Sequence, residues 1–128
     1  MNREVVIIMP YIGSVLSVNH YLGRGAYGKP YLKKEVVAWK AELGWKIKPY
    51  HIEEWALPLT VTCNGVFRDL RSCPDLSNLA KVVLDAIEET TGINDRNMRW
   101  QDGNIKIDKE EKPHLEIIIE QFREARCR

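Results

Sequence analysis

The chain has 128 residues, of which 45% are apolar and 29% are charged, and its formal net charge is +1. This length suits one domain, residues 1–128, with one modest core, and the composition is that of a soluble globular protein. The near-neutral charge excludes a strongly basic DNA-binding composition. The three cysteines form no CxxC pair, which argues against a disulfide framework or a zinc site. No apolar run is long enough to cross a bilayer or to form a signal-peptide core, so we expect a cytoplasmic protein.

The first part of the chain predicts a strand, a loop and a helix. Val5–Met9 is mostly apolar and ends at Pro10, which is typical of a short strand. Asn19–Tyr31 contains three glycines, and this density predicts neither helix nor strand. From about Tyr31 to Lys48, apolar residues recur every three or four positions, which predicts an amphipathic helix.

Aromatic and basic residues alternate in the loop, a composition suited to contact with a nucleic-acid backbone and with exposed bases. Residues 1–50 have a charge balance of +5 and the remaining residues one of −4. A basic region that grips phosphate beside an acidic region that holds metal would produce this distribution. A plain surface loop explains the composition equally well, and ordinary charge scatter explains the charge distribution equally well. The functional and the structural interpretations therefore both remain open. The candidate DNA contacts are Asn19, Arg24, Lys29, Lys33 and Lys34.

The second part begins with a strand and a helix. Apolar and polar residues alternate from Leu57 toward Phe67, which predicts a strand with one buried face and a possible bulge at Gly65. After a loop, the stretch from Leu76 to about Thr90 is the clearest helix in the chain, and Gly92 is well placed to end it. Its apolar stripe consists of Leu79, Val82, Val83, Ala86 and Ile87.

Two further strands complete the predicted fold. Met98–Ile107 predicts a strand interrupted at Asp102-Gly103, and His114–Glu120 predicts a final strand. The resulting order is β-α-β-α-β-β. This order predicts a single α+β domain with helices packed on one sheet, mostly antiparallel or mixed.

Polar residues on the second helix suggest chemistry. Asn78, Lys81 and Asp85 are spaced three and four apart, so they line the side opposite the apolar stripe. Asp75 precedes the helix, and Asp95 follows it and a turn. Carboxylates hold Mg²⁺, and a lysine stabilises charge that develops on a phosphate. The arrangement therefore suits phosphodiester hydrolysis.

Structural interpretations of the same residues remain open. Asp75 fits the N-cap position of the helix. Lys81 and Asp85 are placed for a surface ion pair, and Asp95 can simply form a turn.

The run PDLSNLAKVVLDAIEETTGINDRNM, residues 74–98, resembles the signature of RusA-type Holliday junction resolvases, which has the form D-L-D-N-L-x-K-x-x-x-D-A-L followed by a turn ending in D-D. The residues that match it in order and spacing are Asp75, Asn78, Leu79, Lys81, Asp85, Ala86 and Asp95. The flanking segments resemble the family more weakly.

The resemblance implies a homodimeric endodeoxyribonuclease that resolves four-way DNA junctions by paired symmetric nicks during recombination and repair. It implies Mg²⁺ as cofactor, with Mn²⁺ as a substitute. Asp75 and Asp95 would be metal ligands, and Lys81 would contact the scissile phosphate. Asp85 would be a ligand or a partner of Lys81, and Asn78 would have an auxiliary role.

Two positions depart from the family pattern. Ser77 replaces the second acid of D-x-D, and Asn94 replaces the first acid of D-D. In one interpretation, Asp85 or a nearby acid such as Asp69 completes the metal shell in their place. Alternatively, the protein binds junctions without cutting them, or it is an α+β domain whose partners are proteins. We expect an active nuclease because the rest of the constellation is intact.

Overall fold

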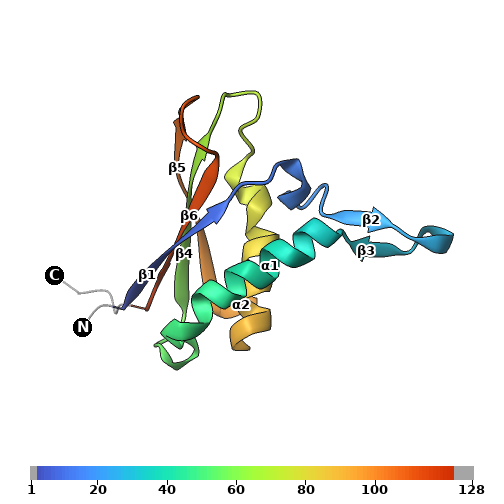
Figure 1. Ribbon diagram of the computed structural model, residues 1–128. Helices are drawn as coiled ribbons and strands as arrows, with labels where there is room; N and C mark the ends of the chain where they lie inside the picture. Colours follow the sequence, from blue (N-terminus) through green and yellow to red (C-terminus); the bar gives the residue numbers. More distant parts are fainter. Residues whose placement is uncertain (1–2, 123–128) are drawn as a thin grey trace.

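A four-stranded sheet with two helices on one face forms the body of the protein in this computed structural model, which describes residues 3–122 (Figure 1). The strands are β1 (Glu4–Pro10), β4 (Leu59–Phe67), β5 (Met98–Ile107) and β6 (His114–Glu120), and the helices are α1 (Lys34–Ile47) and α2 (Ala80–Thr91). These elements follow the predicted order and confirm the single α+β domain. Within the described residues, no helix is long and apolar enough to span a membrane.

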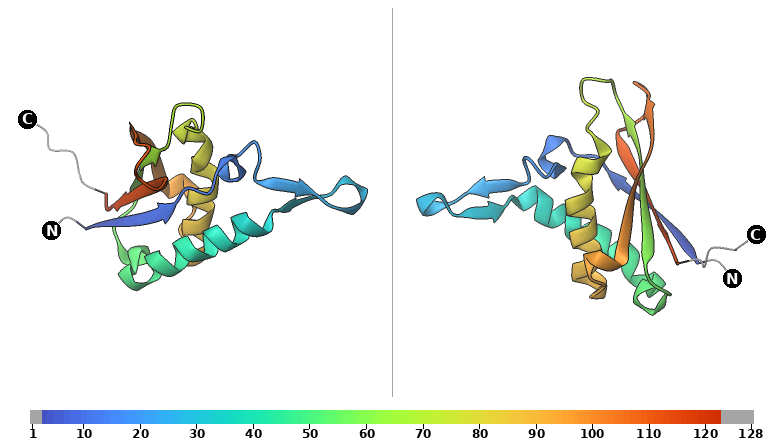
Figure 2. Two further views of the ribbon diagram at one scale, coloured as in Figure 1. Left: turned by 45° about the horizontal axis from the view of Figure 1, so that its top comes forward. Right: turned by 180° about the vertical axis from the view of Figure 1, so that it is seen from behind.

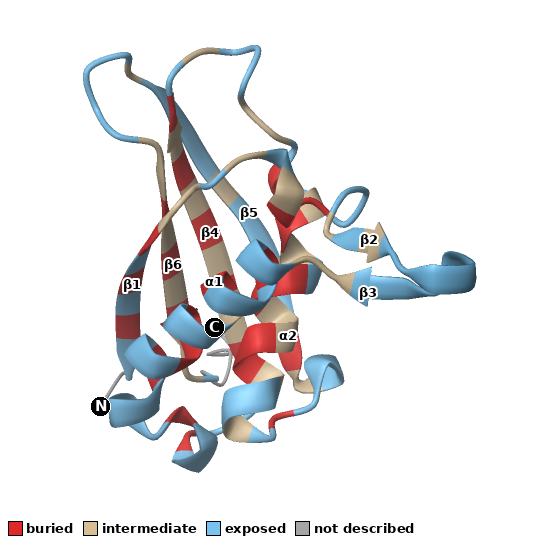
Figure 3. Cartoon of the chain, turned by 45° about the vertical axis from the view of Figure 1, so that its right-hand side comes forward, coloured by how far each residue is buried: buried red, intermediate tan, exposed pale blue. Residues whose placement is uncertain are grey.

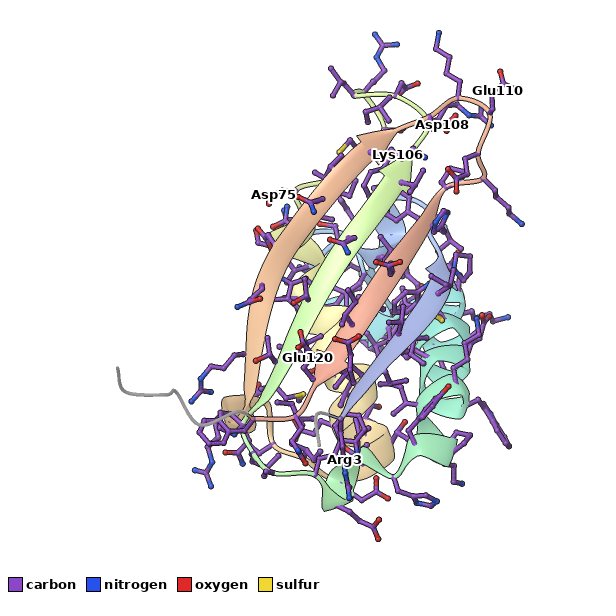
Figure 4. The ribbon with its side chains drawn as sticks, turned by 90° about the vertical axis from the view of Figure 1, so that its left-hand side faces the viewer. Arg3, Asp75, Lys106, Asp108, Glu110 and Glu120 are labelled. Carbon is purple, nitrogen blue, oxygen red and sulfur yellow. The ribbon has the colours of Figure 1, made fainter. Side chains whose placement is uncertain are left out.

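The sheet is mixed, with the strand order β1-β6-β4-β5. β6 runs antiparallel to both β1 and β4, whereas β4 and β5 run parallel to each other. Parallel neighbours need a crossover connection, and the segment containing α2 provides it. Both helices lie against the same face of the sheet, and Figure 4 looks onto the opposite, uncovered face.

Alternating burial along the strands builds the core between the sheet and the helices (Figure 3). Every second residue of β4 is buried, including Cys63, which confirms the predicted strand with one buried face. Two side chains of α1 reach the sheet: Trp39 Nε1 donates to the Pro10 carbonyl at 2.7 Å, and Lys46 Nζ donates to the Ile8 carbonyl at 2.8 Å. Both bonds hold α1 along β1, the edge strand.

The prediction that Asn19–Tyr31 contains no strand is wrong. β2 (Leu22–Arg24) and β3 (Pro30–Leu32) form an antiparallel hairpin that projects from the body (Figure 2). The glycines do not break this hairpin. Gly23 pairs with Tyr31, and a Cβ at position 23 would lie only 2.5 Å from the Tyr31 ring. The missing side chain therefore makes room for the aromatic ring.

The second helix is confirmed, with one change at its start. Its first turn is a 3-10 helix, η5 (Leu76–Leu79), and α2 follows directly. All five residues of the predicted apolar stripe are buried. Gly92 ends the helix in the left-handed conformation with φ 79°, as predicted.

β5 is continuous, so the predicted interruption at Asp102-Gly103 is wrong. The irregularity lies in its pairing with β4, where the register shifts between Cys63 and Gly65. The extra residue is on β5, because Cys63 pairs with Asp102 and Gly65 pairs with Ile105. Asn64 spans the shift, since its Oδ1 accepts a hydrogen bond from the backbone N–H of Asn104 at 2.7 Å.

Candidate active site

One side of α2 faces a cleft of about 630 Å³ that contains three of the predicted site residues, Lys81, Asp85 and Asp95. Lys81 Nζ lies 3.2 Å from Asp85 Oδ1, so these two residues, one helical turn apart, form the ion pair that their spacing allows. Asp95 reaches the same cleft because the chain turns back after Gly92 and enters η6 (Asp95–Asn97). The turn after α2 therefore brings Asp95 to the same cleft as Lys81 and Asp85.

The environment of Lys81 keeps it charged. The hydrogen bond that Lys81 donates to Asp85 and the charge of that carboxylate raise the pKa of Lys81 above its ordinary value, and the charge of Asp95 acts in the same direction. At neutral pH the side chain is an ammonium ion. It is suited to stabilising negative charge on a phosphate, and not to accepting a proton.

Asp75 occupies the N-cap of η5, so the helix-capping interpretation is correct for this residue. Its Oδ1 accepts hydrogen bonds from the backbone N–H of Ser77 at 3.2 Å and from the Ser77 hydroxyl at 2.9 Å. The residue is nevertheless exposed and lines a second cleft of about 450 Å³. Asn78 and Asn19, two other predicted site residues, line this cleft as well.

The remaining candidates serve local structure. Asp69 Oδ1 accepts from the backbone N–H of Ser72 at 2.8 Å, and this bond lowers the pKa of the Asp69 carboxyl group. Asp69 lines neither cleft. Asn94, the neutral residue at the D-D position, caps η6 by accepting from the backbone N–H of Arg96 at 3.0 Å. Ser77 and Asn94 thus each have a structural task that requires no charge.

The three predicted metal ligands do not meet in one place. Asp75 lies in the second cleft, whereas Asp85 and Asp95 lie in the first. Among residues 3–122 no group of three or more His, Cys, Asp or Glu side chains could hold a metal ion. Mg²⁺ does not need such a group, because proteins often bind it through one or two carboxylates together with substrate phosphates and water. The oxygen donors of the two clefts fit this open mode of binding, and not a closed cage.

The residues predicted to contact DNA also lie in different parts of the structure. Arg24 and Lys29 lie on the projecting hairpin, and Lys33 and Lys34 lie where it joins the start of α1. Asn19 is apart from them, in the second cleft.

The structure adds charged residues that the sequence did not single out. Lys40 of α1 lines the first cleft and forms an ion pair with Glu89 of α2. Its position, four residues after Val36 and three before Leu43, beside the buried stripe, is a signal that could have identified it. His20 and Arg71 line the second cleft with Asp75. They come from separate loops, and no spacing in the sequence indicates that they meet.

Comparison with known proteins gives one informative result. A family model described as Endodeoxyribonuclease RusA matches residues 13–120. No curated protein matches the chain.

Two solved structures show weak likenesses. 2C-methyl-D-erythritol 2,4-cyclodiphosphate synthase from Plasmodium vivax is 11% identical, with a TM-score of 0.37 over 97% of this chain and 98% of that one. IspF of Plasmodium falciparum in its CDP complex is 12% identical, with a TM-score of 0.31 over 70% of this chain and 56% of that one. Both TM-scores are too low to support an argument.

Proposed function

The chain belongs to the RusA family of endodeoxyribonucleases, and from this membership we propose that it resolves four-way (Holliday) DNA junctions by metal-dependent phosphodiester hydrolysis. The observation that carries the proposal is the placement of Lys81 beside Asp85 and Asp95 in a cleft on the side of α2 away from the core. Asp75 lies at the start of the same helical segment. These residue types suit metal-dependent hydrolysis of a phosphodiester.

Each group has a distinct task in this mechanism. The Lys81 ammonium ion contacts the scissile phosphate and stabilises the charge that grows on it during bond cleavage. Asp85 accepts a hydrogen bond from Lys81 and so orients the ammonium group. The carboxylates that would bind Mg²⁺, or Mn²⁺ in its place, are Asp85 and Asp95 in the first cleft and Asp75 in the second, in each case together with substrate phosphates and water. The metal would supply a polarised phosphate and an activated water.

We propose that the active form is a homodimer. A four-way junction is cut at two symmetric positions, and two copies related by a twofold axis present two identical sites for this purpose. The division of the acidic residues between two clefts is compatible with an assembly in which neighbouring copies share the substrate. The proposed role is in DNA recombination and repair, and the proposed location of the protein is the cytoplasm.

The first test uses a labelled synthetic four-way junction and a linear duplex of the same sequence, each with and without Mg²⁺ or Mn²⁺. We expect paired nicks on the junction only, and only with metal. Asp75→Asn should abolish cutting without unfolding the protein, because asparagine caps helices about as well as aspartate. Undiminished cutting by Asp75→Asn would show that this carboxylate is not part of the site.

A junction-binding protein without catalysis is the second candidate, and Ser77 and Asn94 favour it. Both replace acids of the family pattern. The Ser77 hydroxyl donates a hydrogen bond to Asp75, and the Asn94 side chain caps η6. In this case the junction would be retarded in the gel but uncut with every divalent metal. The double variant Ser77→Asp, Asn94→Asp should then gain cutting, whereas the active-enzyme proposal requires the unaltered chain to cut.

A further inference from the structure

The hairpin formed by β2 and β3 stands away from the rest of the protein. It extends beyond the N-terminal end of α1 in all three ribbon views, and its surface is exposed (Figures 1, 2 and 3). Its tip is a single turn of 3-10 helix, η2 (Ala26–Gly28). Leu32 at the base of the arm packs against the core, whereas residues 24–31 are exposed. The tip is therefore available for contact with another molecule.

The tip of the arm presents one aromatic side chain. Tyr27 has a relative exposure of 102%, so its ring has no appreciable contact with the protein. Its backbone is left-handed, with φ 61° and ψ 22°, a conformation that tyrosine adopts at a cost. Asparagine or glycine would satisfy this turn better. The shape of the turn therefore does not explain the choice of tyrosine.

Hydrogen bonds hold the tip in a defined shape. Gly25 N–H donates to the Lys29 carbonyl at 2.7 Å, and Arg24 Nη1 donates to the Gly28 carbonyl at 3.2 Å. Below the tip, the Tyr31 ring packs over Gly23. The exposed ring at position 27 is thus presented on an ordered support, which lowers the entropy lost when it binds.

The charge around Tyr27 identifies the kind of partner. The chain has no acidic residue from Val5 to Lys34, and the arm and its base carry Arg24, Lys29, Lys33 and Lys34. Such a surface attracts phosphate. A basic surface combined with an exposed aromatic ring is the arrangement that binds unstacked nucleic-acid bases, because every base offers a face for stacking.

We propose that Tyr27 is a specificity-determining residue, which stacks on an unpaired or unstacked base at the branch point of a four-way junction. This inference rests on the proposed function. An intact linear duplex keeps its bases stacked and offers no such face away from its ends, so Tyr27 favours branched over linear DNA. The basic side chains of the arm bind the backbone of both.

The test compares variants that separate the ring from the turn. Tyr27→Asn removes the ring and favours the left-handed backbone, whereas Tyr27→Trp keeps an aromatic ring. Tyr50→Ala is the matched control, since Tyr50 is also an exposed tyrosine but lies in η3 (Lys48–Tyr50), which follows the C-terminal end of α1. The substrates are a junction with 2-aminopurine at the branch point and the corresponding linear duplex.

Loss of the ring should cost junction binding specifically. We expect Tyr27→Asn to weaken junction affinity about 5- to 100-fold, the range for one aromatic–base stack. Stacking by the parent protein should change the emission of 2-aminopurine at the branch point, and Tyr27→Asn should remove this change. The affinity for linear duplex and its salt dependence should stay unchanged. Tyr27→Trp and Tyr50→Ala should behave like the parent protein.

Each other result overturns the inference. If Tyr27→Asn binds and reports on the junction as the parent does, the ring does not contact a base. Equal loss of duplex and junction affinity would assign Tyr27 to general DNA binding. A change in the molar mass of the protein in solution would assign the arm to contact between subunits. If the parent itself shows no preference for junctions, the proposed function fails along with the inference.

Discussion

Replacement of Lys81 by alanine should separate catalysis from stability. Lys81 is half exposed and its ion pair with Asp85 spans one helical turn at 3.2 Å, a kind of pair that contributes about 0.3–0.5 kcal/mol. Alanine is also a better helix former than lysine. The free energy of unfolding should therefore change by no more than about 0.5 kcal/mol. Loss of one preorganised charge that stabilises the transition state should lower the cleavage rate about 10²- to 10³-fold, or about 3–4 kcal/mol in activation free energy.

The assay is a single-turnover cleavage rate on a labelled four-way junction, measured beside thermal unfolding of the same preparation. Lys106→Ala is the control, because Lys106 is also exposed and paired with carboxylates, Glu111 at 3.3 Å and Asp108 at 3.7 Å, but on β5 and away from both clefts. It should cut at the rate of the parent. If Lys81→Ala also retains the parent rate, Lys81 only forms an ion pair and the proposed role is refuted.

The further predictions concern stability and thiol chemistry. Gly44→Ala should destabilise the protein by about 1 kcal/mol in denaturant unfolding, because the new Cβ would collide with the Thr90 hydroxyl where the helices meet. Adding Thr90→Ala should restore stability. If the single variant were more stable than the parent, the close contact would be contradicted. Gly92→Ala should cost about 1–2 kcal/mol by the same measurement, since alanine disfavours φ 79°, and an unchanged midpoint would argue against this helix end. Burial raises the pKa of Cys63 from 9.0 to about 12, so the unfolded state loses its proton first and stability should fall by up to about 1.4 kcal/mol per pH unit across this interval. In peptide-level alkylation at pH 8, Cys63 should be protected while the partly exposed Cys73 reacts, and equal labelling would contradict this burial.

The elements that the sequence predicted well are those whose burial follows a simple period. The stripe on α2, the alternation in β4 and the glycine at position 92 each reflect a local constraint that is visible in a few residues. The β2–β3 hairpin was missed because its glycines were interpreted as breaking structure. One of them, Gly23, instead makes room for the ring of Tyr31 across the hairpin.

The sequence indicated candidate site residues but not how they are arranged. Spacing on one helix placed Lys81 beside Asp85, and the structure confirms the contact. Spacing could not show that Asp75 and Asp95 line different clefts, because the position of Asp95 depends on how the chain turns after the helix. The contribution of Lys40, from a distant helix, depends on the packing of α1 against α2.

The parallel pairing of β4 with β5 has a consequence for how the protein opens and closes. The backbone hydrogen bonds of β5 can form only after residues 68–97 have crossed over and α2 has packed, so edge strand and helix should order together. In native-state hydrogen exchange, the amides of α2 and β5 should then behave as one cooperative unit, distinct from β1, β6 and β4. Because this unit contains Asp75, Lys81, Asp85 and Asp95, a partly opened molecule would lose all four proposed site residues at once. Nuclease activity would accordingly be all-or-none in each molecule.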